Sequence, residues 1–476
     1  MVISALAATA AGAAARPAAL FSDNAVLQQG VVVPVWGKGE NGEKVTVKFQ
    51  GQTVSTVVRD GTWLVKLAPL KPGGPFTMTI SGSETVERER PATVSSTILL
   101  SNILVGEVWV CSGQSNMAFG LSKVSNATEA IALSSDPMLR LFTVPRMTSY
   151  TPIEDVEASW LPCNAETVTS FTAVGYFFGR DLRKAMNVPV GLIHSSWGGT
   201  FAQAWTSPDG FKALPEYTQW VADENSKKET GPNHASVLYN GMISPLIPYA
   251  IKGAIWYQGE ANAGAAYRYR TLFPTMIKSW RDAWGQGNFP FLFVQLAPYL
   301  KVNPEPGESS WAELREAQLL TTKTSPKTGM AVITDVGDPG NIHPTQKEPV
   351  GARLALAARK IAYGESIVYS GPIYKGKKIT GSSITLYFDH VGGGLVARDG
   401  DLKGFAVAGA DKKFVWATAG IVNGNKVVVS SPSVPNPEAV RYGWASCPVV
   451  NLWNKDGLPA SPFRTDDYPM VTVPQK

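Results

Sequence analysis

The chain has 476 residues, more than one hydrophobic core usually supports, so two or three domains are expected. Its net charge of +5 comes without a long basic run, which argues against a nucleic-acid-binding surface. No apolar window beyond the N-terminus is long enough for a membrane helix, and three cysteines without a CxxC motif argue against a disulfide scaffold or a zinc ribbon.

The N-terminal part of the chain contains two kinds of sequence. Residues 1–17 are small and apolar and end in an Ala-x-Ala-like sequence, so we interpret them as a signal-peptide remnant and expect a secreted or periplasmic protein. Residues 18–98 contain short apolar runs separated by Gly, Pro, Asn and Asp. Alternation of apolar and polar residues is clearest in Lys44–Phe49 and Thr62–Leu67. This pattern predicts an N-terminal β-sandwich domain.

Residues 99–366 alternate between strand-like runs and helix-length segments. The expected strands are Val105–Cys111, Val188–His194, Lys252–Tyr257, Phe289–Leu296 and Met330–Asp335. The expected helices are Ser170–Met186, Tyr267–Trp284, Ser310–Thr322 and Thr345–Tyr363. This alternation predicts an α/β domain, in which a mostly parallel sheet is flanked by helices. Residues 206–250 are a candidate lid, and residues 367–476 return to short strands that predict a C-terminal β-rich domain.

Polar, glycine-rich segments follow four of the expected strands. They are Gly113–Asn116, His194–Thr200, Tyr257–Asn262 and Asp335–Pro344. An open α/β sheet binds its ligand beyond the carboxyl ends of its strands, so we expect these four segments to gather there. Together they supply a serine, backbone N–H donors, an amide and an acid–histidine pair.

The residue types in these segments indicate nucleophilic catalysis by Ser115. A serine hydroxyl is a poor nucleophile until a base takes its proton, and histidine is the natural base near neutral pH. His343 is the best candidate base, because it follows a strand and lies close to two aspartates. The other histidines have less suitable positions: His194 is within or at the end of a strand, His234 is in a loop, and His390 is in the distal β region.

An acid is expected to orient His343 and to stabilise its charged form. Asp338 is favoured because it is nearer in sequence, and Asp335 is the alternative. Either aspartate could instead be a helix cap or a turn residue.

The oxyanion that forms during acyl transfer needs fixed hydrogen-bond donors. The candidates are the Ser115 N–H, an N–H of the Gly198–Gly199 pair, and the Gln258 amide. The glycines could instead form a plain turn, and Gln258 could be a buried structural amide. Glu260 is expected to position Gln258 or bind substrate, while a role in a glycosidase carboxylate pair is a minor alternative. The candidate substrate contacts are Gln114, Asn116, Trp197, Glu260 and Asn262.

The motifs GQSNM, SSWGGT, WYQGEAN and GDPGNIHP together resemble the sialate O-acetylesterase family, carbohydrate esterases of the SGNH-hydrolase superfamily that include acetylxylan esterases. LFSDNAVLQQG, VLYNGMISPLIPYAIKGAIWYQGE and GLPASPFRTDD extend the resemblance over most of residues 18–470. It implies that Ser115 is the nucleophile and His343 the base, with no metal or organic cofactor. The superfamily's acid lies three residues before the histidine, where this chain has Gly340. Asp338, Asp335 or a backbone carbonyl therefore remain candidates for that role.

The resulting prediction is a serine esterase with an SGNH-type sheet that removes O-acetyl groups from a sugar. Its expected partner is an acetylated carbohydrate, with neither nucleic acid nor a membrane. One alternative is acetylated xylan or another plant polysaccharide as the substrate. The other is a carbohydrate-binding protein that lacks activity. The sequence leaves the sugar, the acetyl position and the oligomeric state open.

Overall fold

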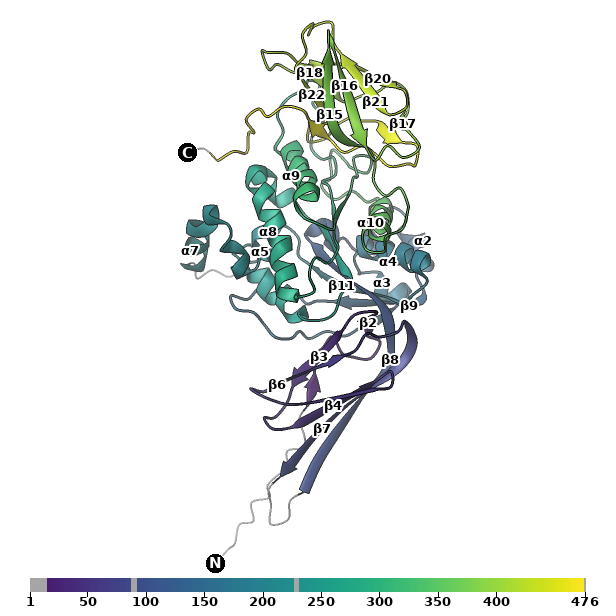
Figure 1. Cartoon of the computed structure of the whole chain (residues 1–476), viewed down its shortest axis with the longest axis vertical. Helices are drawn as coiled ribbons and strands as arrows, with labels where there is room; N and C mark the ends of the chain where they lie inside the picture. The colour runs from purple at the N-terminus through teal and green to yellow at the C-terminus, as the bar shows by residue number, and fades with distance from the viewer. Residues whose placement is uncertain (1–14, 87–91, 227–230, 475–476) are drawn as a thin grey trace, which may run out of the picture.

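The structure, a computed structural model, describes residues 15–86, 92–226 and 231–474. In Figure 1, N-terminal strands, a helix-flanked sheet and C-terminal strands follow one another along the long axis of the molecule. The expected signal-peptide remnant, residues 1–17, lies mostly outside the described residues. Within the described ranges, no helix is both long and apolar enough to cross a bilayer.

Two groups of strands form the N-terminal part. The first sheet contains β1 (Arg16–Pro17), β3 (Val33–Lys38) and β6 (Thr62–Leu67). The second group contains β2 (Val26–Gln28), β4 (Lys44–Phe49), β5 (Gln52–Val57), β7 (Gly73–Val86) and the start of β8 (Ala92–Gly113). Alternate side chains of β3, β4 and β6 are buried in one shared apolar cluster, as the period of two in the sequence predicts. The long strand β8 continues into the central sheet, so the predicted boundary at residue 98 falls inside a strand.

The central sheet has the order β10-β9-β11-β8-β12-β13-β14. All its pairs are parallel except the edge pair of β9 and β10. Besides β8, its strands are β9 (Asp136–Thr143), β10 (Leu161–Cys163), β11 (Val190–Ser196), β12 (Gly253–Tyr257), β13 (Phe291–Val294) and β14 (Thr328–Ala331). The fold is therefore a mixed α/β fold with a large mixed sheet.

Helices cover both faces of this sheet (Figure 1). Val108, Val110 and Trp256 pack in one apolar cluster with α8 (Ala266–Trp284) and α9 (Ser310–Thr324). A second apolar cluster contains α4 (Ala173–Met186), α10 (Glu348–Ile361) and the adjacent residues of the same two strands, Trp109, Cys111, Ile255 and Tyr257. Successive residues of a strand point to opposite faces, so continuous apolar strands bury both faces and bring their polar ends to one edge.

Short helices complete the central region. They are α1 (Ser115–Ala118), η1 (Leu121–Lys123), α2 (Ala127–Ala132), α3 (Ala165–Val168), α5 (Ala202–Trp205), α6 (Pro208–Phe211), η2 (Pro215–Tyr217), α7 (Thr218–Ser226), η3 (Tyr239–Ile243), η4 (Ser244–Leu246) and η5 (Glu260–Ala265).

Several element boundaries differ from the prediction. The strand expected over Met330–Asp335 ends at Ala331, because the chain turns where the Val336 N–H donates to the Ile333 carbonyl. Strand β9 was not predicted, since its first two residues are Asp and Pro. Helix α10 begins at Glu348 rather than at Thr345, which leaves Lys347 at its N-cap.

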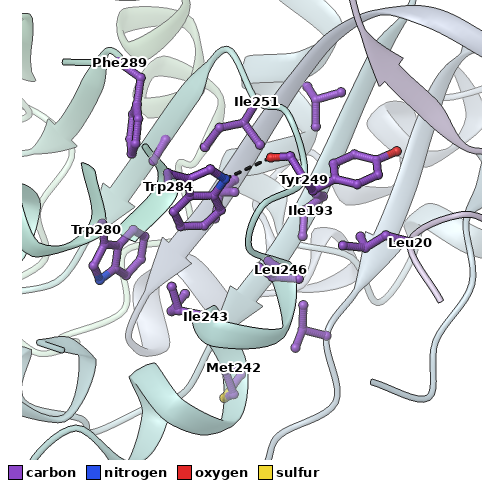
Figure 2. Close-up of a cluster of buried hydrophobic side chains, with 14 of the residues drawn as sticks. Leu20, Ile193, Met242, Ile243, Leu246, Tyr249, Ile251, Trp280, Trp284 and Phe289 are labelled. Atoms are coloured by element: carbon purple, nitrogen blue, oxygen red, sulfur yellow. Dashed lines mark hydrogen bonds between the residues drawn. The ribbon is translucent and has the colours of Figure 1, made fainter. Parts of the chain in front are cut away.

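The candidate lid, residues 206–250, is in large part core. Met242, Ile243, Leu246 and Tyr249 are almost fully buried among aromatic side chains (Figure 2). The Trp284 indole N–H also donates to the Tyr249 carbonyl, 2.9 Å away (Figure 2). This part of the segment therefore belongs to the hydrophobic core and is not a surface flap.

The C-terminal strands have an apolar cluster of their own. One sheet contains β15 (Ile373–Thr380), β16 (Ser383–Asp389), β21 (Lys426–Ser430) and β20 (Thr418–Val422). A second contains β19 (Val415–Trp416), β18 (Phe405–Ala408), β22 (Ala439–Tyr442) and β24 (Phe463–Arg464), and β17 (Leu395–Ala397) pairs with β23 (Leu452–Asn454). The buried Arg315 of α9 connects them to the central region by donating to the Ala445 and Ser446 carbonyls.

Candidate active site

Ser115 begins helix α1, directly after the carboxyl end of β8. The turn requires Gly113, which has a φ of +137° and where a Cβ would lie 2.1 Å from the Tyr257 carbonyl oxygen. The Gln114 N–H donates to that same carbonyl over 2.9 Å. Strand β12 therefore fixes the turn, and Ser115 remains partly exposed beside it.

The glycine pair lies beside this serine. Strand β11 runs parallel to β8, and after it the Trp197 N–H donates to the Gly113 carbonyl over 3.1 Å. A Cβ at Gly198 would lie only 3.2 Å from the Ser115 Cβ, so Gly198 packs directly against the serine. Gly199 has a φ of +73° and open space where its side chain would be. Of the pair, Gly198 is the residue in contact with Ser115.

His343 lies on the loop between β14 and α10, close to the Ser115 turn. The Asn116 side-chain amide donates to the Ile342 carbonyl over 2.9 Å, which joins the residue after Ser115 to the residue before His343. The His343 ring also stacks on Phe119, with centroids 6.3 Å apart and planes 30° apart. Burial lowers the pKa of His343, and the charges of Lys347 and Lys123 lower it further. A lowered pKa keeps the imidazole neutral, the form that can accept a proton.

The two candidate acids are engaged elsewhere. Asp338 is exposed and accepts from the Gly340 N–H over 2.8 Å within its own turn. Asp335 forms a two-point ion pair with Arg353, at 2.6 and 2.7 Å. Within the described residues, neither carboxylate is hydrogen-bonded to the His343 ring. Asp338 thus lies in a turn, one of the alternatives considered for it, whereas Asp335 is an ion-pair partner, a role that the sequence analysis did not consider.

We therefore expect Asp338→Asn and Asp335→Asn to leave kcat close to that of the parent protein. A triad aspartate would cost about 10⁴-fold in kcat when replaced by asparagine, because the histidine tautomer changes. Asp335→Asn should instead lower the unfolding free energy by about 1–3 kcal/mol, since it removes a charged partner of Arg353. Steady-state kinetics and thermal unfolding of both variants measure this. A loss near 10⁴-fold in either variant would identify that aspartate as the acid.

Gln258 is fully buried and both of its amide N–H groups have protein partners. They donate to the Thr200 carbonyl at 3.1 Å and to the Asn262 Oδ1 at 2.6 Å, while its oxygen accepts from the Tyr269 hydroxyl. Asn262 is itself buried and donates to Gln203. In this conformation Gln258 and Asn262 connect the segments that follow β11 and β12, and both N–H groups of Gln258 are engaged away from Ser115.

The other predicted substrate contacts differ in exposure. Gln114 is buried, and its side-chain oxygen accepts from the Gly259 and Ala261 N–H groups. Trp197 is half-buried, with the Arg146 guanidinium 5.9 Å from the centroid of its ring. Of the two, Trp197 has the side chain that is available to a ligand.

Asn116 and Glu260 bind one another. The Asn116 Nδ2 donates to the Glu260 Oε1 over 2.6 Å, and the Asn116 Oδ1 accepts from the Lys347 Nζ over 2.5 Å. The sequence analysis did not single out Lys347. A lysine just before a helix is usually solvated, and no local signal marks this one as buried.

His194 has the environment of a core histidine. It lies within β11, and its Nε2 is 2.6 Å from the Ser196 hydroxyl. Burial lowers its pKa to about 4, with a further lowering by Arg146. His390 lies far along the chain, against the ring of Tyr369. Of these three histidines, His343 is the one whose loop is hydrogen-bonded to the Ser115 turn, through Asn116 and the Ile342 carbonyl.

Comparison with known proteins identifies the family. Residues 105–360 match the family model of carbohydrate esterases described as sialic acid-specific acetylesterase. Sialate O-acetylesterases from Mus musculus and Homo sapiens are each 32% identical over 95% of this chain, covering 94% and 93% of those proteins. The crystal structure of a carbohydrate acetylesterase from Xanthomonas citri is 40% identical, with a TM-score of 0.86 over 96% of this chain and 100% of that one. The chain therefore belongs to the sialic acid-specific acetylesterase family of carbohydrate esterases.

Proposed function

We propose that the protein is a serine esterase that removes O-acetyl groups from sugars, with Ser115 as nucleophile and His343 as base. The observation that supports this most directly is the Asn116–Ile342 hydrogen bond, which joins the two loops that carry these residues. The names of the relatives agree with the reaction class. We also propose that the central sheet is of the SGNH type and that the protein is exported.

In this mechanism, His343 takes the Ser115 proton while the serine oxygen attacks the acetyl carbonyl. The Ser115 and Gly198 N–H groups stabilise the oxyanion, since Gly198 packs against the serine and Ser115 is the first residue of α1. The acetyl–sugar C–O bond breaks, and His343 returns its proton to the sugar oxygen. Water that gives a proton to His343 then attacks the acetyl-enzyme, the acetyl–Ser115 bond breaks, and His343 returns the proton to the Ser115 oxygen as acetate leaves.

The mechanism proposed here does not include Gln258 or an aspartate. The Gln258 amide would first have to leave Thr200 and Asn262. The half-buried Trp197 offers an apolar surface next to the Ser115 turn, and we propose that it contacts the sugar.

Acetate release from a small panel tests the reaction class. We expect hydrolysis of an aryl acetate and of at least one acetylated carbohydrate among acetylated sialosides, xylan and glucomannan. An N-acetylated sugar without O-acetyl groups is the control and should release nothing, because an amide is a much poorer acyl donor. A fluorophosphonate should label the peptide that contains Ser115. Binding of sugars without acetate release or labelling would instead favour a non-catalytic carbohydrate-binding protein.

A further inference from the structure

Lys347 occupies a position that ordinary helix rules disfavour. It is the N-cap residue of α10, it forms no side-chain cap hydrogen bond, and it is fully buried. N-caps favour Ser, Thr, Asp and Asn, and a positive charge opposes the positive end of the helix dipole. Burying an ammonium group costs several kcal/mol unless it is paired. A residue that breaks local rules in this way is expected to have a compensating role.

The compensation comes from a second buried charge, reached through one amide. Lys347 Nζ donates to Asn116 Oδ1, and Asn116 Nδ2 donates to Glu260 Oε1. The ammonium also lies 5.0 Å from the Phe119 ring centroid and 5.2 Å from that of Tyr257. Among the residues that the structure describes, the buried Glu260 Oε2 has no hydrogen-bond partner, and Asn116 is the side chain that binds Oε1.

This bridge joins three segments that are far apart in the sequence. Asn116 and Phe119 belong to the Ser115 turn and the residues that follow it. Glu260 follows β12, and Lys347 closes the loop that carries His343. The same Asn116 amide also donates to the Ile342 carbonyl, so one side chain of the Ser115 turn contacts both of the other segments.

We propose that Lys347 is a positioning residue of the esterase site: paired with Glu260 through Asn116, it fastens the loop of His343 to the turn of Ser115. This inference rests on the proposed function, because it assigns a role relative to Ser115 and His343. The Lys347 ammonium contacts Asn116, Phe119 and Tyr257, and within the described residues it forms no hydrogen bond with Ser115 or the His343 ring.

The same placement gives Lys347 an electrostatic effect on His343. The groups that face the His343 ring are Phe119, Lys347 and Lys123, while Asp338 is bound to its own turn. Burial lowers the pKa of Lys347 to about 7, against the opposing effect of Glu260. Below that pH the ammonium is charged and disfavours protonation of His343. Removing it should raise the pKa of His343 and move the acid limb of the rate profile to higher pH.

Replacing Lys347 with methionine tests both its positioning of the His343 loop and its electrostatic effect on the pKa of His343. We expect kcat for an aryl acetate to fall about 10- to 100-fold, because a misplaced base is costly, while KM changes little. The acid limb of kcat/KM against pH should shift to higher pH, which a purely structural loss would not produce. A kcat within threefold of the parent, or a fall in kcat without that shift, would overturn the proposal.

Lys123→Met is the matched control. Lys123 is exposed and also lowers the pKa of His343, but it is not part of the Asn116 bridge. It should shift the acid limb and leave kcat nearly unchanged. If Lys347→Met does not fold, Glu260→Gln/Lys347→Met removes both buried charges together and is judged by the same two criteria. All variants are compared with an active parent protein, whereas the Ser115→Ala variant alone decides whether the serine mechanism holds.

Discussion

Ser115→Ala should lower kcat for acetate release by about 10⁴-fold or more, because the acetyl-enzyme can no longer form. The substitution should leave the fold intact. Within the described residues the Ser115 side chain has no hydrogen bond, and alanine suits the first position of a helix. The unfolding free energy should therefore change by no more than about 0.5 kcal/mol. Acetate release and thermal unfolding, measured on the same preparation, separate the two effects.

Ser122→Ala provides the matched control for this result. Ser122 is exposed in η1, seven positions after Ser115, and lies outside the proposed machinery. Its replacement should leave kcat and stability unchanged. If Ser115→Ala retained substantial acetate release, the serine mechanism would be wrong while the family membership would stand.

His343→Asn should lower kcat by about 10²- to 10⁴-fold, the range that a positioned general base contributes. His390→Asn is the matched control, because His390 has a φ of +57° that asparagine tolerates well. The control should keep parental activity. Equal losses in the two variants would indicate a general effect of removing a histidine, and they would contradict the assignment of His343 as base.

The parent protein should lose activity on the acid side as His343 becomes protonated. Burial, Lys347 and Lys123 all lower the pKa of His343 from its ordinary value of 6.5. The base therefore stays neutral further into the acid range than a free histidine would, and the midpoint of the acid limb should lie below pH 6.5. A kcat/KM profile whose acid limb has its midpoint above pH 6.5 would contradict this placement of the two lysines.

The alternation of apolar runs allowed much of the central sheet to be predicted. Val108–Cys111 and Ala254–Tyr257 are continuous apolar runs, which is the pattern of strands buried on both faces. The strand expected over Val105–Cys111 lies within β8, and the one expected over Lys252–Tyr257 begins one residue later, at Gly253. The periodic helix expected over Tyr267–Trp284 begins one residue earlier and ends at the same residue. Strand β9 was missed because its pairing with β11 depends on a partner that local sequence does not reveal.

The polar side chains near the site illustrate what the sequence pattern could not decide. Gln258 and Asn262 follow a strand, as a substrate-facing pair would, yet they bind one another. Asp335 lies in the motif of the predicted base, but its two-point partner Arg353 is on α10. A strand-end motif predicts which edge of the sheet a side chain lies near. The direction in which that side chain points depends on hydrogen-bond and ion-pair partners from other segments.

The sequence by itself determined the family, the mixed α/β class and the turn in which Ser115 follows Gly113, because these depend on local periodicity and motifs. Only the tertiary structure decided which polar groups stand beside Ser115. Asn116 meets Glu260 across 144 positions and Lys347 across 231 positions of the chain. Pairing of buried charges over such separations is set by how strands and helices pack together. For that reason the sequence alone suggests an ordinary solvated lysine at position 347, whereas the folded structure buries Lys347 against Asn116.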